Sequence, residues 1–192
     1  MKLVAEKLKI LIINGSVHVD SLNLKIAKIV EKELQSLETQ STLIHLGEEK
    51  LPPFEGYGVP YPPRVNEILK LMTQADGFIF VVPEYHRSMP SVFKNLFEYI
   101  DDEEVKIEDR PAALVTATEG QWGQFAQMSM HGMLRTLRVW LVPDQMYISQ
   151  ASTLLDEQGN LKDEKLLERL KSLVSRLVRA SELLRPLRNG NG

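Results

Sequence analysis

The sequence contains no cysteine, which excludes disulfide bonds, thiolate nucleophiles, cysteine-ligated zinc and iron–sulfur clusters. No apolar run approaches the roughly 18 residues that a membrane-spanning helix needs, and residues 1–9 lack the apolar block of a signal peptide. Neither sign of charge dominates, because 23 Lys and Arg oppose 26 Asp and Glu, which disfavours a nucleic-acid or membrane surface. We therefore expect a cytoplasmic protein that binds neither nucleic acid nor a membrane.

The composition is that of a globular protein. Of the 192 residues, 43% are hydrophobic and 26% are charged, enough to bury a sizeable core. We find no internal repeat and no interdomain linker. The sequence predicts a single domain over residues 1–192, with a frayed C-terminal tail from about residue 186.

Short apolar runs alternate with amphipathic helical periods, the pattern of a parallel sheet covered on both faces. The apolar runs predict strands at 10–13, 41–46, 78–82, 111–116 and about 145–149. The helical periods predict helices at 24–34, 64–74, 91–99, 124–137 and 163–184. We expect a break at Pro143-Asp144 before the last strand, and irregular structure over 51–63.

Five such strand–helix units predict an α/β fold, a doubly wound five-stranded parallel sheet with an order such as 2-1-3-4-5. Right-handed crossovers bring the carboxyl ends of the strands to one edge. Because ligands bind at that edge in open parallel sheets, function is sought in the loops after the first, third and fourth strands.

The loop after the first predicted strand, residues 15–23, has polar donors but no fixed positive charge. The side chains that could donate hydrogen bonds to a phosphate are Ser16, Ser21 and Asn23. The motifs GxGxxG and GxxxxGK[ST] are absent, so a monophosphate fits better than a dinucleotide. The alternative is that Ser21 and Asp20 compete as helix caps and Asn23 is solvated. His18 either complements a phosphate when protonated or is simply exposed.

The loop after the third strand, residues 83–90, combines an aromatic ring, two cations, a hydroxyl and a carboxylate. We interpret it as a wall for a flat ring, with Tyr85 against the ring and backbone groups of 84–88 at a heteroaromatic edge. The alternative is a rigid turn in which Tyr85 covers the core.

Residues 83–95, PEYHRSMPSVFKN, resemble the PEYNxSxPGxLKN signature of the NADPH-dependent FMN reductase family. The first loop is similar to the same family's GSxRxxSxN phosphate loop, and the likeness spans about 9–149. The resemblance implies a flavodoxin-like fold, FMN as cofactor and NADPH or NADH as co-substrate. It also implies a homodimer or homotetramer.

The resemblance assigns the cofactor site residue by residue. Contacts to the FMN phosphate are implied for Ser16, Ser21, Leu22 and Asn23, and His18 of the same loop is a further candidate. Contacts to the ring and ribityl chain are implied for Pro83, Glu84, Tyr85, His86, Arg87 and Ser88. The loop after the fourth strand resembles the third flavin-facing loop of the family and adds Thr118, Glu119 and Gly120. By itself this third loop also fits a plain glycine turn.

The chain departs from the family pattern at several positions. His18 stands where the family usually has Arg, so a fixed positive charge is lost. His86 and Arg87 replace the usual Asn and small residue, and Ser91 replaces Gly. Arg87 either restores charge at the phosphate or points toward the phosphates of the nicotinamide nucleotide.

The predicted function is an NAD(P)H-dependent oxidoreductase that passes hydride through FMN to a small electron acceptor. The acceptor is a free flavin, quinone, azo compound or metal oxyanion, and no catalytic side chain is required. The alternative is a non-enzymatic FMN-binding redox partner or regulator, in which Arg87 blocks nicotinamide entry. We expect no metal site, since the run 101–104 is typical of a solvated acidic turn. His45, on a predicted strand, is expected to be structural.

Overall fold

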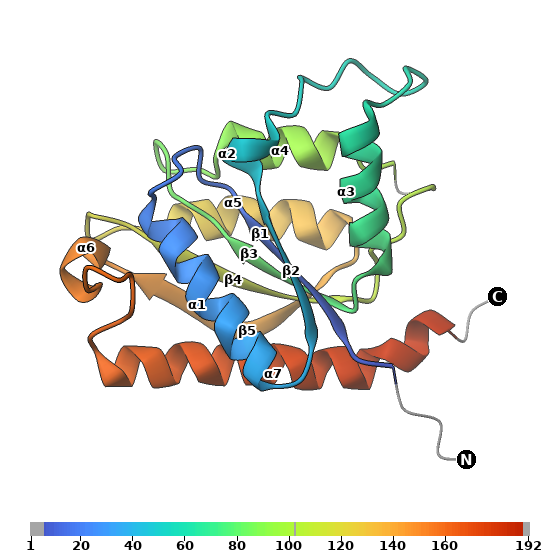
Figure 1. The fold of residues 1–192 in the computed structure, drawn as a ribbon. Coiled ribbons are helices and arrows are strands. Elements are labelled where there is room, and N and C mark those ends of the chain that lie inside the picture. Colours follow the sequence, from blue (N-terminus) through green and yellow to red (C-terminus); the bar gives the residue numbers. More distant parts are fainter. Residues whose placement is uncertain (1–5, 102, 190–192) are drawn as a thin grey trace, which may run out of the picture.

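The computed structural model describes residues 6–101 and 103–189, which build one five-stranded sheet. The strands are β1 (Lys9–Asn14), β2 (Gln40–His45), β3 (Gly77–Val81), β4 (Pro111–Ala117) and β5 (Trp140–Ile148). All neighbours are parallel, in the order β2-β1-β3-β4-β5 (Figure 1). This is the flavodoxin-like order of a doubly wound sheet, and it confirms the predicted fold class.

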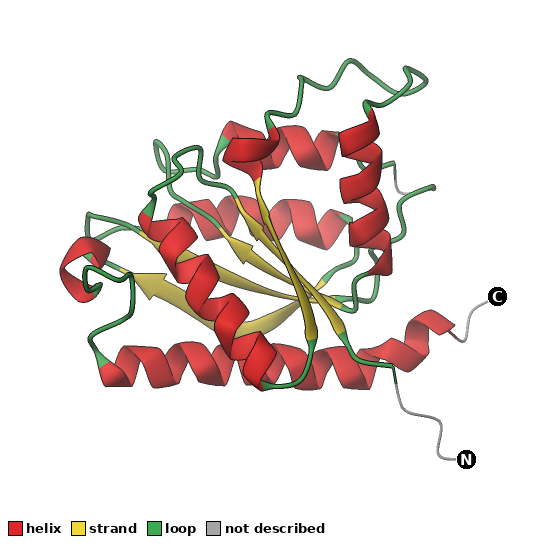
Figure 2. Ribbon diagram, in the orientation of Figure 1, coloured by secondary structure: helices red, strands yellow, loops and turns green. Residues whose placement is uncertain are grey.

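Helices cover both faces of the sheet (Figure 2). They are α1 (Leu22–Ser36), α2 (Leu46–Glu49), α3 (Pro63–Gln74), α4 (Ser91–Glu98), α5 (Gln124–Thr136), α6 (Ala151–Leu154) and α7 (Glu164–Asn189). Alternate residues of β1 enter two separate cores, because successive strand side chains point to opposite faces. Leu11 and Ile13 pack with α3, α4 and α5, whereas Ile10 and Ile12 pack with α1 and α7.

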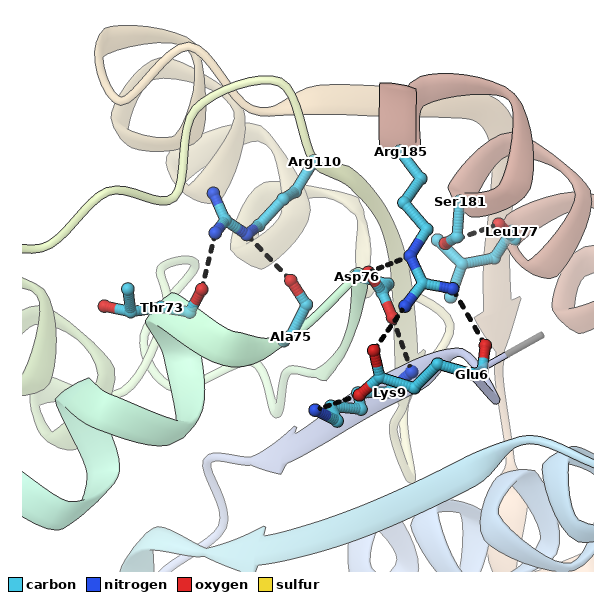
Figure 3. Close-up of polar contacts among 9 residues, drawn as sticks. All are labelled: Glu6, Lys9, Thr73, Ala75, Asp76, Arg110, Leu177, Ser181 and Arg185. Carbon is cyan, nitrogen blue, oxygen red and sulfur yellow. Dashed lines mark hydrogen bonds and ion pairs between the residues drawn. The ribbon is translucent and has the colours of Figure 1, made fainter. Parts of the chain in front are cut away.

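A polar network with buried Asp76 and Arg110 closes the amino-terminal edge of the sheet (Figure 3). The carboxylate of Asp76 accepts a hydrogen bond from the Lys9 N–H at 2.7 Å and lies 3.5 Å from the guanidinium of Arg185 on α7. The Arg110 side chain donates to the carbonyls of Thr73 and Ala75 at the end of α3. The loops that follow β1, β3 and β4 lie at the opposite, carboxyl edge of the sheet.

The predicted boundary of the last strand is wrong. Strand β5 begins at Trp140, not near residue 145, and it runs through Pro143. Its register against β4 shifts between the pairs Ala112↔Leu141 and Leu114↔Gln145. An edge strand tolerates proline at such an irregularity, because the missing N–H has no neighbour to pair with.

The structure describes residues 186–189 of the predicted frayed tail as helix, and the fraying itself stays a prediction. Helix α7 continues through Pro186 to Asn189. Arg185 anchors this end, because its guanidinium donates to the Glu6 carbonyl at 2.9 Å. Residues 190–192 of the predicted tail lie outside the described residues. None of the described helices has the length and apolar character to cross a membrane.

Candidate functional site

The loops after β1, β3 and β4 surround an open cavity of about 600 Å³ at the carboxyl edge of the sheet. This volume lies within the usual range for a cofactor site. The cavity is lined by Ser16, His18, Asp20, Ser21, Leu22, Asn23, Pro83, Glu84, Tyr85, Ala117, Thr118, Glu119, Gly120 and Trp122. Three loops far apart in sequence therefore meet, as the parallel topology requires.

Most of the predicted cofactor residues line this one cavity. His86, Arg87 and Ser88 are the predicted residues that do not. Asp20 and Trp122 line it in addition, and both lie in loops that the sequence had singled out. Direct binding by each of these side chains stays a prediction.

The start of α1 presents free backbone donors to the cavity. Ser21, not Asp20, is the N-cap, since its hydroxyl accepts from the Leu24 N–H at 3.0 Å. The N–H groups of Leu22 and Asn23 lie in the first turn of the helix, where a backbone N–H has no carbonyl partner within the helix. Asp20 instead pairs with Lys25 at 2.8 Å, and this contact lowers the pKa of the Asp20 carboxyl. The helix start thus offers N–H donors and the positive end of its dipole to an anion.

The Asn23 side chain ties the first loop to the third. Its Nδ2 donates to the Ala117 carbonyl at 2.8 Å, and its Oδ1 accepts from the Ala117 N–H at 3.0 Å. Asn23 is buried, so the alternative of a solvated side chain is wrong. Of the two hydrogens on Nδ2, one is bonded to the Ala117 carbonyl. The predicted contact of this side chain with a phosphate can therefore use only the other one.

The second loop makes a tight two-residue turn. Tyr85 and Ser88 exchange two backbone hydrogen bonds of 3.0 and 3.1 Å, and φ is +49° at His86 and +61° at Arg87. Positive φ at both central residues is the type I′ geometry, which favours Asn-Gly. The Arg87 guanidinium lies 5.2 Å from the centre of the Phe125 ring. The turn therefore holds Arg87 beside the start of α5 and outside the cavity wall.

Tyr85 and Glu84 have separate roles in this loop. Tyr85 lines the cavity and is 37% exposed, which argues against the alternative that it covers the core. The Glu84 carboxylate accepts from the Ala126 N–H at 3.1 Å and so caps α5, whose own N-cap residue makes no side-chain bond. Burial, with a contribution from Glu84, raises the pKa of Tyr147.

Side chains of the third loop are held by hydrogen bonds within the protein. The Thr118 hydroxyl donates to the Gly120 carbonyl at 3.0 Å, and the Glu119 carboxylate accepts from Ser152 at 2.6 Å. A Cβ atom at Gly120 would meet no protein atom within 4 Å. The space beside Gly120 is thus open to a ligand.

The cavity wall is poor in positive charge. It contains no Lys or Arg, and its charged side chains are Asp20, Glu84 and Glu119. An anion here relies on hydroxyls, backbone N–H groups and the helix dipole. Within residues 6–101 and 103–189, no three His, Asp or Glu side chains are grouped to hold a metal ion. Asp102 of the acidic run lies outside these ranges.

Comparisons with known proteins agree with this geometry. A profile of the family described as NADPH-dependent FMN reductase matches residues 8–153. The chain is 32% identical over 124 residues to an NAD(P)H-dependent FMN reductase of Pseudomonas aeruginosa, covering 63% of this chain and 67% of the relative. It is 28% identical over 162 residues to a 2-hydroxy-1,4-benzoquinone reductase of Burkholderia sp, covering 82% of this chain and 87% of the relative.

A solved structure shares the fold. The flavoenzyme NAD(P)H:(acceptor) oxidoreductase of Paracoccus denitrificans superposes with a TM-score of 0.80 at 23% sequence identity. The superposition covers 91% of this chain and 97% of that one. At this identity the likeness speaks for the fold alone.

Proposed function

The chain belongs to the NADPH-dependent FMN reductase family, and on this premise we propose that it uses FMN to carry electrons from NAD(P)H to a small acceptor of the quinone class. The observation that carries the proposal is the cavity itself. Neutral donors of the first loop and the aromatic side chains Tyr85 and Trp122 of the other two loops share one space of about 600 Å³.

The residues present fit FMN. The hydroxyls of Ser16 and Ser21 and the N–H groups at the start of α1 suit a phosphate. Tyr85 offers a flat face to a ring, and the space beside Gly120 lets the backbone approach the ring closely. The neutral, hydrogen-bonded character of the first loop suits one phosphate rather than a pyrophosphate.

Bound FMN supplies the chemistry, since it accepts a hydride from NAD(P)H and passes a hydride equivalent to the acceptor. The chain's own residues bind and orient. Ser21 and Asn23 fix the phosphate loop, Glu84 fixes the second loop to α5, and Tyr85 and Trp122 line the space for the ring. The proton that a quinone takes up together with the hydride comes from water in this proposal, so no side chain of the cavity is assigned to proton transfer.

Arg87 takes the phosphates of the nicotinamide nucleotide in this proposal. Among the described residues its exposed guanidinium has no carboxylate or carbonyl acceptor, and it rests on Phe125 outside the cavity wall. A guanidinium outside the cavity is better placed to contact the phosphates of NAD(P)H than to contact the phosphate of FMN inside it. The same position removes one motive for the alternative of a non-enzymatic flavin module, namely that Arg87 blocks entry of the nicotinamide.

The acceptor and the assembly are parts of the same proposal. A quinone is favoured over free flavin, azo compounds and metal oxyanions because the benzoquinone reductase aligns over 87% of its length. Val19, Tyr85, Trp122 and Met128 are exposed, and two of them, Tyr85 and Trp122, line the cavity. A second copy of the chain covers these apolar side chains in a homodimer or homotetramer.

The test begins with the purified protein and added FMN. Flavin absorption that stays with the protein after gel filtration is expected. Stopped-flow mixing with NADPH should then bleach the bound flavin, and a benzoquinone should restore its colour with steady NADPH oxidation. A protein that takes up no FMN would overturn the proposal. Tight FMN binding without reduction by NADPH or NADH would favour the non-enzymatic alternative.

A further inference from the structure

A buried polar pair joins the ends of the two strands that precede the phosphate loop and α2. Asn14 is the last residue of β1 and His45 the last of β2, and they are direct partners in the parallel register. Their exposed fractions are 0% and 6%. The Asn14 Nδ2 and the His45 Nδ1 lie 2.9 Å apart. The pair is therefore a hydrogen bond of ordinary length between two buried side chains.

The direction of this bond follows from the third partner. The Ser16 N–H faces the Asn14 Oδ1 at 3.5 Å, and a backbone N–H can only donate. Asn14 thus turns its NH₂ toward the ring, so the His45 Nδ1 accepts. The neutral ring then carries its proton on Nε2, and that atom is buried without a hydrogen-bond partner among the described residues.

An unpartnered buried N–H is a cost that an apolar side chain at the same place would avoid, and such exceptions in folded proteins call for an explanation. The explanation here is the role of the other ring nitrogen, Nδ1, as a hydrogen-bond acceptor. His45 Nδ1 is what keeps the Asn14 amide turned with its oxygen toward Ser16.

The segment after His45 touches the same loop. A Cβ atom at Gly47, in α2, would lie 2.7 Å from the Ser16 carbonyl oxygen and 2.8 Å from the Val17 Cα. Glycine thus lets the backbone of α2 support the loop directly. The end of β2 and the start of α2 hold Ser16 from two sides, one through Asn14 and one through the main chain.

We infer that His45 is a positioning residue for the phosphate end of the cofactor site, acting through Asn14 on Ser16. The inference rests on the proposed function, since it concerns the site proposed there for the FMN phosphate. Loss of the Nδ1 acceptor should therefore weaken the binding of the phosphate and leave the binding of the flavin ring unchanged.

The test compares the dissociation constants of FMN and riboflavin, which differ only in the phosphate, for four full-length proteins. His45→Leu removes the acceptor. His45→Asn keeps an acceptor oxygen near the place of Nδ1. Ile44→Val is the matched control, a buried neighbour on the same strand that faces the opposite side of the sheet. Unfolding midpoints are measured alongside.

His45→Leu is expected to raise the FMN dissociation constant about tenfold, equivalent to about 1.4 kcal/mol, with riboflavin affinity within about twofold of wild type. His45→Asn should restore most of the phosphate preference. Ile44→Val should lower the midpoint and leave the ratio of the two constants unchanged. Should His45→Leu fail to fold, His45→Ala removes the same acceptor, leaves Asn14 in place and should lose the same preference.

Two outcomes overturn the inference, and they differ from failure of the proposed function. An unchanged FMN-to-riboflavin ratio in His45→Leu, or a parallel loss of both affinities, would make His45 merely structural. In either case the wild type would still bind FMN and react with NADPH. A wild type that binds neither flavin would remove the proposed function and this inference together.

Discussion

The side chain of Asn23 spans 94 residues of sequence to pair with both backbone groups of Ala117, at 2.8 and 3.0 Å. It joins the loop after β1 to the loop after β4, the two loops on either side of the one after β3. The residue that resembles a phosphate ligand in sequence thus also fixes the width of the cavity. Stability and cofactor affinity should therefore change together at this position.

Asn23→Ala is expected to lower the free energy of unfolding by about 2–4 kcal/mol, because two buried groups of Ala117 lose their partners. FMN affinity should fall in the same variant. Chemical denaturation and flavin titration measure the two effects. Asn66→Ala is the control, since exposed Asn66 donates a single bond to the Tyr61 carbonyl; a loss below about 0.5 kcal/mol is expected there. Equal losses in both variants would contradict the role of Asn23 in joining the two loops.

His18→Arg should strengthen FMN binding. The cavity wall has no Lys or Arg, so a guanidinium in the first loop adds a charge-assisted contact to the phosphate. We expect the dissociation constant to fall about fivefold (about 1 kcal/mol) and to become more sensitive to salt. Val17→Arg puts the same charge in the same loop off the cavity wall. An equal gain from that control would mean that long-range charge alone is responsible.

Replacing His86-Arg87 by Asn-Gly should stabilise the fold. Both residues hold positive φ, which costs side chains with a Cβ about 1–2 kcal/mol each, and Asn-Gly suits a type I′ turn. Loss of the contact between Arg87 and Phe125 offsets part of the gain, so a net rise of about 1 kcal/mol is expected. Glu38→Gly, at a second positive φ far from the cavity, is the comparison. Destabilisation by the Asn-Gly variant would show that the turn is not strained.

The same Asn-Gly variant should bind NAD(P)H more weakly despite its higher stability. If Arg87 contacts the nucleotide phosphates, the KM for NADPH rises about five- to tenfold, with kcat and FMN affinity unchanged. Arg179→Ala removes an exposed cation on α7 and should leave the KM unchanged. Steady-state kinetics with saturating quinone gives both constants. An unchanged KM in the Asn-Gly variant would refute the role proposed for Arg87.

Gly77→Ala tests the docking of α7 on the sheet, away from the cavity. A Cβ atom at Gly77 would overlap the buried Ser181 hydroxyl, which donates to the Leu177 carbonyl (Figure 3). We expect a loss of about 1–3 kcal/mol from overpacking. Adding Ser181→Gly removes the obstructing atom and should recover part of that loss, as a double-mutant cycle would show. A purely additive cycle would contradict direct contact.

Sequence periodicity alone determined the fold. Runs such as 10–13 and 78–82 are apolar on every position, as a strand buried on both faces must be, and the helices between them impose parallel, right-handed connections. The convergence of three loops followed from topology, which is why most predicted residues line one cavity. The start of β5 was predicted wrongly, because a proline usually interrupts a strand and the register shift that accommodates Pro143 appears only in the pairing of β5 with β4.

Tertiary structure decided what the polar residues contact. Sequence cannot show that the Asn23 amide is occupied by Ala117, that the Glu84 carboxylate caps α5, or that Asn14 turns its NH₂ to His45. These partners lie 31 to 94 positions apart and meet only after the sheet has formed. A side chain's hydrogen-bonding groups are the same in any sequence context, whereas its partners depend on which strands become neighbours.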